Sequence, residues 1–229
     1  MSKPIVTVII PAYNEEQSIG KVVNDIPRSI VSHVIVVNNN STDSTVEVAR
    51  KAGAIVLDES RRGYGWACLK GIEHSKTLNT DIVVFLDGDY SDYPQEIPNV
   101  LAPILETDMD MVIGSRVLGQ REKGSLTPQQ IFGNWLATKL VRLFYRARFT
   151  DLGPFRAIKA DSLEQLKMSD KTYGWTIEMQ IKAAKHKMKF CDVPVNYKKR
   201  IGISKVSGTI KGTVLAGIKI ILAVFKYRF

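Results

Sequence analysis

Two carboxylates that follow an apolar run are the first residues in this chain that could do chemistry. Asp87 and Asp89 flank Gly88 directly after the run Asp81–Leu86. Mg²⁺ and Mn²⁺ take oxygen ligands of this kind and usually share them with substrate phosphates. Asp and Gly are also ordinary turn residues, so an acidic turn is the alternative. The strand context favours a metal-binding pair, and we expect Asp87 and Asp89 to hold Mg²⁺ or Mn²⁺.

A second group of chemically capable residues follows the apolar run Ile5–Ile10. Pro11 ends that run, the Tyr13 ring can stack on a flat ring, and Glu15 can accept hydrogen bonds from base N–H groups. The alternative is a plain strand exit in which Asn14 caps a helix and the acids lie in its first turn. Neither a dinucleotide-binding Gly-x-Gly-x-x-Gly nor a Walker-type phosphate loop follows this run, which disfavours hydride-transfer and P-loop enzymes.

Apolar runs rich in Val and Ile alternate with helix-length segments through the first 115 residues. Strands are expected at Ile5–Ile10, Val31–Val37, Ala54–Leu57, Asp81–Leu86 and Met109–Ile113, and helices at Glu15–Asp25, Ser44–Lys51, Gly65–Lys76 and Ile97–Leu105. Later helices are expected at Gln129–Phe149, Asp161–Met168 and Trp175–His186, with a strand at Lys189–Tyr197. This order predicts an α/β fold with a mostly parallel sheet flanked by helices, in which ligands bind at the carboxyl ends of the strands.

Composition and charge narrow the class of protein. The chain has 229 residues, 45% of them hydrophobic and 24% charged, which disfavours disorder, collagen and coiled coil. Two cysteines make neither a disulfide framework nor a four-ligand zinc site, and no secretory leader is expected, so a cytoplasmic setting is predicted. The net charge is +9, yet residues 182–229 carry +11 and the rest −2. That basic end indicates an anionic lipid surface, nucleic acid or a solvated face.

The motifs, taken in order, resemble those of a family-two glycosyltransferase with the GT-A (Rossmann-like) fold. They are Val8-Ile9-Ile10-Pro11-Ala12-Tyr13-Asn14-Glu15-Glu16, Asn38-Asn39-Asn40-Ser41-Thr42-Asp43 and Asp87-Gly88-Asp89. A closer resemblance is to the dolichyl- or polyprenyl-phosphate mannose or glucose synthase branch. It rests on Gly114-Ser115-Arg116, Asn134, Phe155-Arg156, Gly174-Trp175-Thr176-Ile177-Glu178-Met179 and Arg200-Ile201-Gly202-Ile203-Ser204-Lys205. The resemblance covers roughly residues 4 to 210.

The resemblance implies roles position by position. Pro11, Tyr13, Glu15 and Asn39 would hold the nucleotide base, and Asp87 and Asp89 would hold the metal on the donor diphosphate. Arg116, Arg200 and Lys205 would face phosphates, because guanidinium and ammonium groups offset the repulsion between a lipid phosphate and a diphosphate. Arg62, in the loop Arg61–Ala67, would meet a donor phosphate, or else belongs to a flexible helix entry.

Two positions depart from the family pattern. Asn38 and Asn39 stand where the family usually has two aspartates, and an amide oxygen accepts a base N–H without charge assistance. Arg200 and Lys205 are one residue closer together than is common in the synthases. Asp151 and Glu178 are acids near the expected site, and either is a general base or an ion-pair partner of a basic residue.

The C-terminal end differs in character from the rest of the chain. We expect a catalytic domain at residues 1–207 and an apolar, basic, amphipathic helix at residues 208–229. The apolar stretch Thr213–Phe225 is shorter than the about 20 residues that a membrane-spanning helix needs, and it contains Lys219. A helix lying on the membrane surface is therefore expected, with packing against the domain as the alternative.

The resemblance, together with the basic C-terminal end, implies an inverting, metal-dependent glycosyltransferase. It would move a sugar from a UDP- or GDP-linked donor to a polyprenyl phosphate, while bound peripherally to the cytoplasmic face of an anionic membrane. One alternative is transfer to a soluble or glycan hydroxyl, for which Asp151 or Glu178 would act as base. Another is a nucleotide-sugar-binding protein without transfer activity. Nucleic-acid binding is disfavoured because no recognition motif is present.

Overall fold

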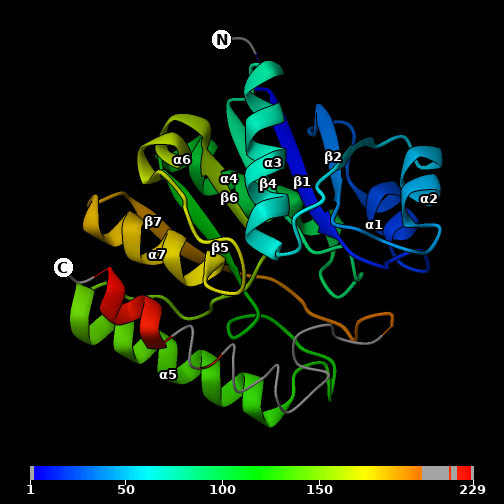
Figure 1. The fold of residues 1–229 in the computed structure, drawn as a ribbon. Coiled ribbons are helices and arrows are strands. Elements are labelled where there is room, and N and C mark those ends of the chain that lie inside the picture. Colours follow the sequence, from blue (N-terminus) through cyan, green and yellow to red (C-terminus); the bar gives the residue numbers. More distant parts are fainter. Residues whose placement is uncertain (1–2, 203–216, 218–220, 228–229) are drawn as a thin grey trace.

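A seven-stranded sheet forms the centre of the structure, a computed structural model that describes residues 3–202, 217 and 221–227 (Figure 1). The strands are β1 (Val6–Ala12), β2 (His33–Asn38), β3 (Ile55–Asp58), β4 (Ile82–Phe85), β5 (Met111–Ser115), β6 (Arg156–Lys159) and β7 (Phe190–Pro194). They lie in the order β3-β2-β1-β4-β6-β5-β7. β6 runs antiparallel to β4 and β5, and the other pairs are parallel. The expected α/β fold with a mostly parallel sheet is confirmed.

Helices cover both faces of this sheet. They are α1 (Ile19–Asp25), α2 (Thr45–Lys51), α3 (Tyr64–Thr77), α4 (Ile97–Thr107), α5 (Pro128–Tyr145), α6 (Ala160–Leu166) and α7 (Trp175–Lys185), with a short 3₁₀ helix at Pro94–Glu96. Alternate residues of each strand point to opposite faces. In β1, Val8 and Ile10 pack in the core with α1, α2 and α4, and Ile9 packs with α3, α5, α6 and α7.

Three expectations about the elements were wrong in detail. Strand β6 was not predicted, because Arg-Ala-Ile-Lys is short, carries charge at both ends and runs straight into α6. The first helix begins at Ile19 rather than Glu15, because the residues before it form a turn in which Ser18 N–H donates to Glu15 O at 3.0 Å. Helix α5 ends at Tyr145 rather than Phe149, because Arg146 is left-handed and closes the helix.

Residues 116–155 form a long connection between β5 and β6. It begins and ends at the side of the sheet where the parallel strands have their carboxyl ends. β5 ends at this side and the antiparallel β6 begins there, so Ile113 pairs with Arg156 and Gly114 N–H donates to Phe155 O at 2.9 Å. The connection carries α5, which begins with a reciprocal capping box between Thr127 and Gln130. Because it returns to the carboxyl edge of the parallel strands, both of its ends lie beside the expected site.

The described part of the C-terminal segment packs on α5 and α7. Phe225 meets Phe144 of α5 at a ring separation of 5.3 Å, and Val224 is fully buried. Lys185 of α7 donates to the Tyr227 carbonyl at 2.7 Å. Residues 221–227 therefore favour the alternative of packing against the domain, while Lys219 and the rest of the expected surface helix lie outside the described residues. Across the described chain, no helix has the length and apolarity needed to span a bilayer.

Candidate active site

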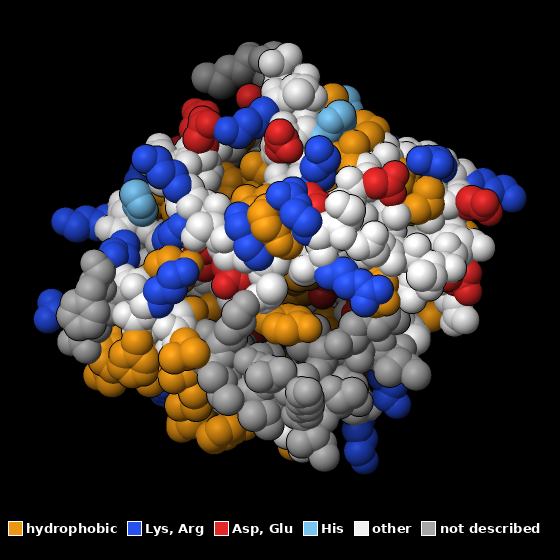
Figure 2. Space-filling view, viewed as in Figure 1, with side chains coloured by type: hydrophobic (Ala, Val, Ile, Leu, Met, Phe, Trp, Pro, Cys, Tyr) orange, Lys and Arg blue, Asp and Glu red, His pale blue; other side chains and the backbone are white. Residues whose placement is uncertain are grey.

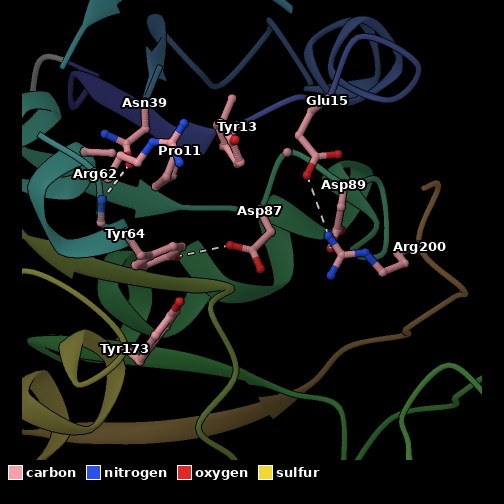
Figure 3. Close-up of a pocket in the computed structure, with 14 residues that line it drawn as sticks. Pro11, Tyr13, Glu15, Asn39, Arg62, Tyr64, Asp87, Asp89, Tyr173 and Arg200 are labelled. Carbon is pink, nitrogen blue, oxygen red and sulfur yellow. Dashed lines mark hydrogen bonds and ion pairs between the residues drawn. The ribbon is translucent and has the colours of Figure 1, made fainter. Parts of the chain in front are cut away.

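A cavity of about 330 Å³ opens at the carboxyl edge of β1, β2 and β4 (Figure 3). Its lining residues come from six separate stretches of the chain. They are Pro11, Ala12, Tyr13, Glu15, Asn39, Arg62, Gly63, Tyr64, Ala67, Asp87, Gly88, Asp89, Tyr173 and Arg200. Eight of the eleven residues expected to act in the site thus lie together. Arg116 and Asp151 pair with each other outside this lining, and Lys205 lies outside the described residues.

The two expected metal ligands face the cavity from the end of β4. All four residues of that strand are buried, which fixes the backbone from which Asp87 and Asp89 project. Burial and the neighbouring charge of Asp89 raise the pKa of Asp87 to about 7. The Tyr64 hydroxyl donates to Asp87 Oδ1 at 3.2 Å and fixes that carboxyl group. The carboxyl groups of Asp87 and Asp89 therefore lie close together in surroundings that disfavour the ionised form of Asp87.

Arg200 offsets part of that charge. Its Nη2 lies 3.0 Å from Asp89 Oδ2 and 3.6 Å from Glu15 Oε1, and Figure 3 shows the guanidinium reaching between the two acids. The loop after β7 holds it there, because Ile201 N–H donates to Asp89 O at 2.9 Å. Arg200 is therefore placed to meet an anion that enters beside Asp89.

The residues present fit a divalent cation that is shared with a ligand. Asp87 and Asp89 supply hard oxygen atoms, and the raised pKa of Asp87 reflects its burial and the neighbouring charge of Asp89, which a cation would balance. Within the described residues, no group of three or more His, Cys, Asp or Glu could enclose a metal by itself. Two carboxylates plus ligand phosphates are the arrangement that Mg²⁺ commonly takes.

Asn39 lines the cavity, but its amide also organises a loop. Its Nδ2 donates to Glu59 O at 3.0 Å and Arg61 O at 2.7 Å, and its Oδ1 accepts from Gly63 N–H at 2.8 Å. An aspartate could not donate either of the first two bonds. An asparagine rather than an aspartate at position 39 is therefore explained by the two hydrogen bonds that its amide donates to the loop. The sequence motif alone did not reveal them.

The loop that Asn39 organises packs tightly against the segment before α7. A Cβ atom added to Gly65 would lie 2.1 Å from Asp170 O, so only glycine fits there. Glu178, fully buried in α7, holds this segment by accepting from the N–H groups of Ser169 at 2.9 Å and Asp170 at 2.7 Å. Because those bonds and a 2.7 Å ion pair with Lys182 engage its carboxylate, Glu178 positions a loop and is poorly placed to act as a base.

Arg116 and Asp151 form a buried ion pair beside the cavity. Arg116 Nη2 lies 2.7 Å from Asp151 Oδ1, and its Nε and backbone N–H both donate to Oδ2 at 2.8 Å. Burial alone would raise the pKa of Asp151, but the charge and hydrogen bonds of Arg116 outweigh it and hold that pKa below its usual range. The geometry therefore favours the ion-pair alternative for Asp151 over a general base.

Sequence reasoning assigned no role to several residues that the structure brings to the site. Tyr64 and Tyr173 line the cavity, and Tyr64 binds Asp87. Asp92 is buried, no described residue hydrogen-bonds its carboxylate, and burial with the charges of Asp87 and Asp89 raises its pKa well above the usual value. Arg156 of β6 is fully buried, and burial lowers its pKa to about 10. Tyr64 and Arg156 stand within the loop Arg61–Ala67 and the motif Phe155-Arg156 that the sequence analysis singled out, so their signal was present but unassigned.

Comparison with known proteins identifies the class. The family profile described as Glycosyl transferase family 2 matches residues 7–167. An uncharacterized glycosyltransferase of Mycobacterium tuberculosis is 32% identical over 219 residues, covering 94% of this chain and 96% of that protein. Together with the acid-lined cavity, these matches define a nucleotide-sugar-dependent glycosyltransferase. The chain belongs to glycosyl transferase family 2.

Other relatives show how broad that family is. The undecaprenyl-phosphate mannosyltransferase of Micrococcus luteus is 28% identical, with 93% of this chain and 92% of that protein covered. A crystal structure of glucosyl-3-phosphoglycerate synthase from Mycobacterium tuberculosis, in complex with Mn²⁺, UDP and glucosyl-3-phosphoglycerate, superposes with a TM-score of 0.78. It is 21% identical, and the match covers 98% of this chain and 80% of that one. This likeness confirms the GT-A-like fold.

Proposed function

We propose that this protein transfers a sugar, with inversion, from a UDP- or GDP-linked donor to a polyprenyl phosphate. The observation that carries the proposal is the 3.0 Å approach of Arg200 to Asp89 inside the cavity. Asp89, which could hold a metal ion together with the donor diphosphate, thus lies beside Arg200, whose guanidinium could bind the phosphate of the acceptor. The name of the Micrococcus luteus relative, an undecaprenyl-phosphate mannosyltransferase, supports the lipid phosphate as acceptor.

The donor would lie in the cavity at the ends of β1, β2 and β4. Pro11, Tyr13 and Glu15 would hold the base together with Asn39, and Arg62 would meet a donor phosphate. Asp87 and Asp89 would hold Mg²⁺ or Mn²⁺; two of the solved glucosyl-3-phosphoglycerate synthase structures contain UDP with Mn²⁺ in one and Mg²⁺ in the other. When bound, such a cation offsets the charge that develops on the leaving diphosphate.

The acceptor would approach from the side of Arg116 and Arg200, and Lys205 would add a further cation. A phosphate acceptor is already anionic, so it needs no residue to remove a proton. This fits the ion pairs of Asp151 with Arg116 and of Glu178 with Lys182, which engage the two acids that the sequence offered as a base. The residues would act by orientation and by offsetting repulsion between phosphates. Residues 1–207 would form the catalytic domain and 208–229 a helix at the cytoplasmic membrane surface.

A transfer screen tests this proposal. The full chain is offered UDP- and GDP-sugars with Mg²⁺ or Mn²⁺, with and without a short polyprenyl phosphate in detergent, and with phosphoglycerate as a soluble acceptor. We expect a glycolipid product only in the presence of the lipid phosphate. Transfer to phosphoglycerate or another hydroxyl acceptor would overturn the lipid acceptor, and donor binding without any transfer would indicate a binding protein.

A further inference from the structure

Helix α5 presents an unusual face to the outside of the molecule. Three large apolar side chains on it are mostly uncovered: Phe132 is 60% exposed, Trp135 52% and Leu143 71%. The Phe132 and Trp135 rings lie side by side, with centroids 5.8 Å apart. The opposite side of the helix is used by the core, where Ala137 and Val141 are buried. An exposed aromatic pair on one side of a packed helix indicates a contact surface.

The same face carries only positive charge. We define the α5 face by its outward side chains, which recur at helical spacings of three and four residues. They are Phe132, Trp135, Lys139, Arg142, Leu143 and Arg146. The stretch 128–149 contains no Asp or Glu. Aromatic and apolar groups flanked by Lys and Arg, without acids, match the chemistry of an anionic lipid headgroup layer above acyl chains.

The described C-terminal residues extend this surface. Leu222 and Phe225 are exposed, and Phe225 packs on Phe144 of α5. In Figure 2 hydrophobic side chains gather at the lower left, over the end of the molecule where α5 and residues 221–227 lie in Figure 1. The apolar area is therefore shared between two segments about 80 residues apart in sequence, which a single exposed side chain would not produce.

A second copy of the chain is a poorer occupant for this surface. A twofold interface places the same patch on both partners, so Lys139, Arg142 and Arg146 would meet the same cations of the other copy. Like charges brought together in this way disfavour association. An anionic lipid surface has the complementary charge and also accepts the aromatic side chains.

The α5 face is also tied to the buried arginine of the site. On the inner side of α5, Asn134 Oδ1 accepts from Leu152 N–H at 2.8 Å, and its Nδ2 donates to Thr150 O at 3.2 Å. These bonds fix the loop that carries Asp151, the ion-pair partner of Arg116. A surface that binds α5 would therefore lie close, through Asn134 and the Thr150–Leu152 loop, to the ion pair that holds Arg116.

We propose that the α5 face docks this protein onto an anionic membrane, with Phe132 and Trp135 inserted between headgroups and Lys139, Arg142 and Arg146 against lipid phosphates. The inference deepens the proposed function and rests on it, because it supplies the surface from which a lipid phosphate would reach Arg116. It differs from the expectation drawn from the sequence, which placed membrane contact in residues 208–229 alone.

Vesicle flotation of the full chain tests the docking. Vesicles of phosphatidylcholine alone are compared with vesicles that also contain phosphatidylglycerol. We expect binding only to the anionic vesicles, a loss of at least about tenfold in affinity for Phe132→Ala/Trp135→Ala, and a similar loss for Lys139→Glu/Arg142→Glu. Leu105→Ala and Lys51→Glu change exposed residues on other helices and serve as matched controls that should bind like the wild type.

Donor binding and sedimentation separate the possible failures. The α5 variants should keep the wild-type affinity for the nucleotide donor and a wild-type unfolding temperature, which shows that they fold. Equal vesicle binding by the α5 variants and the wild type would overturn the proposal, and so would a wild-type dimer that these variants dissociate. Vesicle binding without transfer to a lipid phosphate would overturn the proposed acceptor but support the docking. Transfer to a short lipid phosphate in detergent, without vesicle binding, would support the proposed acceptor but overturn the docking.

Discussion

The half of this molecule that we propose binds the donor (the donor half) and the half that we propose binds the acceptor (the acceptor half) are built in opposite ways. The cavity at β1, β2 and β4 gathers acids, and local hydrogen bonds such as those of Asn39 hold its loops. Beyond β5, the chain carries a buried ion pair, an exposed basic helix and a strongly basic C-terminal fifth. The acids of the first half suit a cation shared with a ligand, and the basic side chains of the second suit anions. The contrast shows that one end of a single sheet can keep acidic and basic side chains in separate regions.

The largest effect should come from the acid that touches both halves. Asp89→Asn removes a proposed cation ligand and the partner of Arg200, so transfer should fall by about a thousandfold. Steady-state transfer rates at saturating Mn²⁺ measure this. Asp161→Asn, an exposed acid on α6, is the matched control and should keep full activity. Full activity in Asp89→Asn would contradict the proposal that Asp89 holds a cation in the donor half.

Breaking the ion pair of the acceptor half should mainly affect stability. Asp151→Asn leaves the Arg116 guanidinium largely buried without its counter-charge, and the free energy of unfolding should fall by about 3 kcal/mol. Urea unfolding at neutral pH measures the loss. A variant that is as stable as the wild type but transfers no sugar would instead support a catalytic role for Asp151.

The pH dependence of that loss provides a further check. The folded-state pKa of Asp151 is below its usual value, so the unfolded chain binds the proton more readily. The pair's contribution is therefore complete above about pH 4, the unfolded pKa, and is lost as the pH falls through the lower folded pKa. The difference in unfolding free energy between wild type and Asp151→Asn should shrink over that range. A difference that grows on acidification would contradict the ion pair.

Asn39→Asp tests whether the donor half depends on amide hydrogen bonds. The aspartate restores the usual family pattern but cannot donate to the carbonyl groups of Glu59 and Arg61, so we expect about 2 kcal/mol of destabilisation. Thermal unfolding and UDP binding by calorimetry are measured together. A gain in UDP affinity without loss of stability would show that this side chain serves the base more than the loop.

The smallest effect is expected at the rim of the cavity. Arg62 lies over the Tyr13 ring at 5.3 Å and faces the opening. Arg62→Ala should raise KM for the donor about two- to fivefold and leave kcat nearly unchanged, as removal of one exposed cation–π contact would. Lys70→Ala, an exposed cation elsewhere on α3, is its control. A large loss of kcat would show that Arg62 stabilises the leaving diphosphate in the transition state in addition to binding the donor.

The donor half could be predicted from the sequence largely because its signals are local. Continuous apolar runs indicated β1, β2 and β4, and their carboxyl ends place Tyr13, Asn39 and Asp87 together. The remaining contacts join residues far apart in the chain. Neither the pairing of Arg116 with Asp151 nor the contact of Arg200 with Asp89 has a periodicity that a sequence displays. Strand β6 has only four residues, which are too few to show an alternating pattern in the sequence.

The antiparallel course of β6 has a consequence for how such enzymes could be rebuilt. Residues 116–155 depart from β5 and return to β6 at one edge, so their two anchor points are neighbours in the sheet. A segment with adjacent ends can be replaced without separating the strands that it joins, provided that the new segment fills the core positions of Ala137 and Val141. We therefore expect that the segment carrying α5, which we propose faces the acceptor, can be exchanged between relatives while the donor half is kept. Grafting this segment from a relative with a soluble acceptor would be the direct way to redirect the sugar.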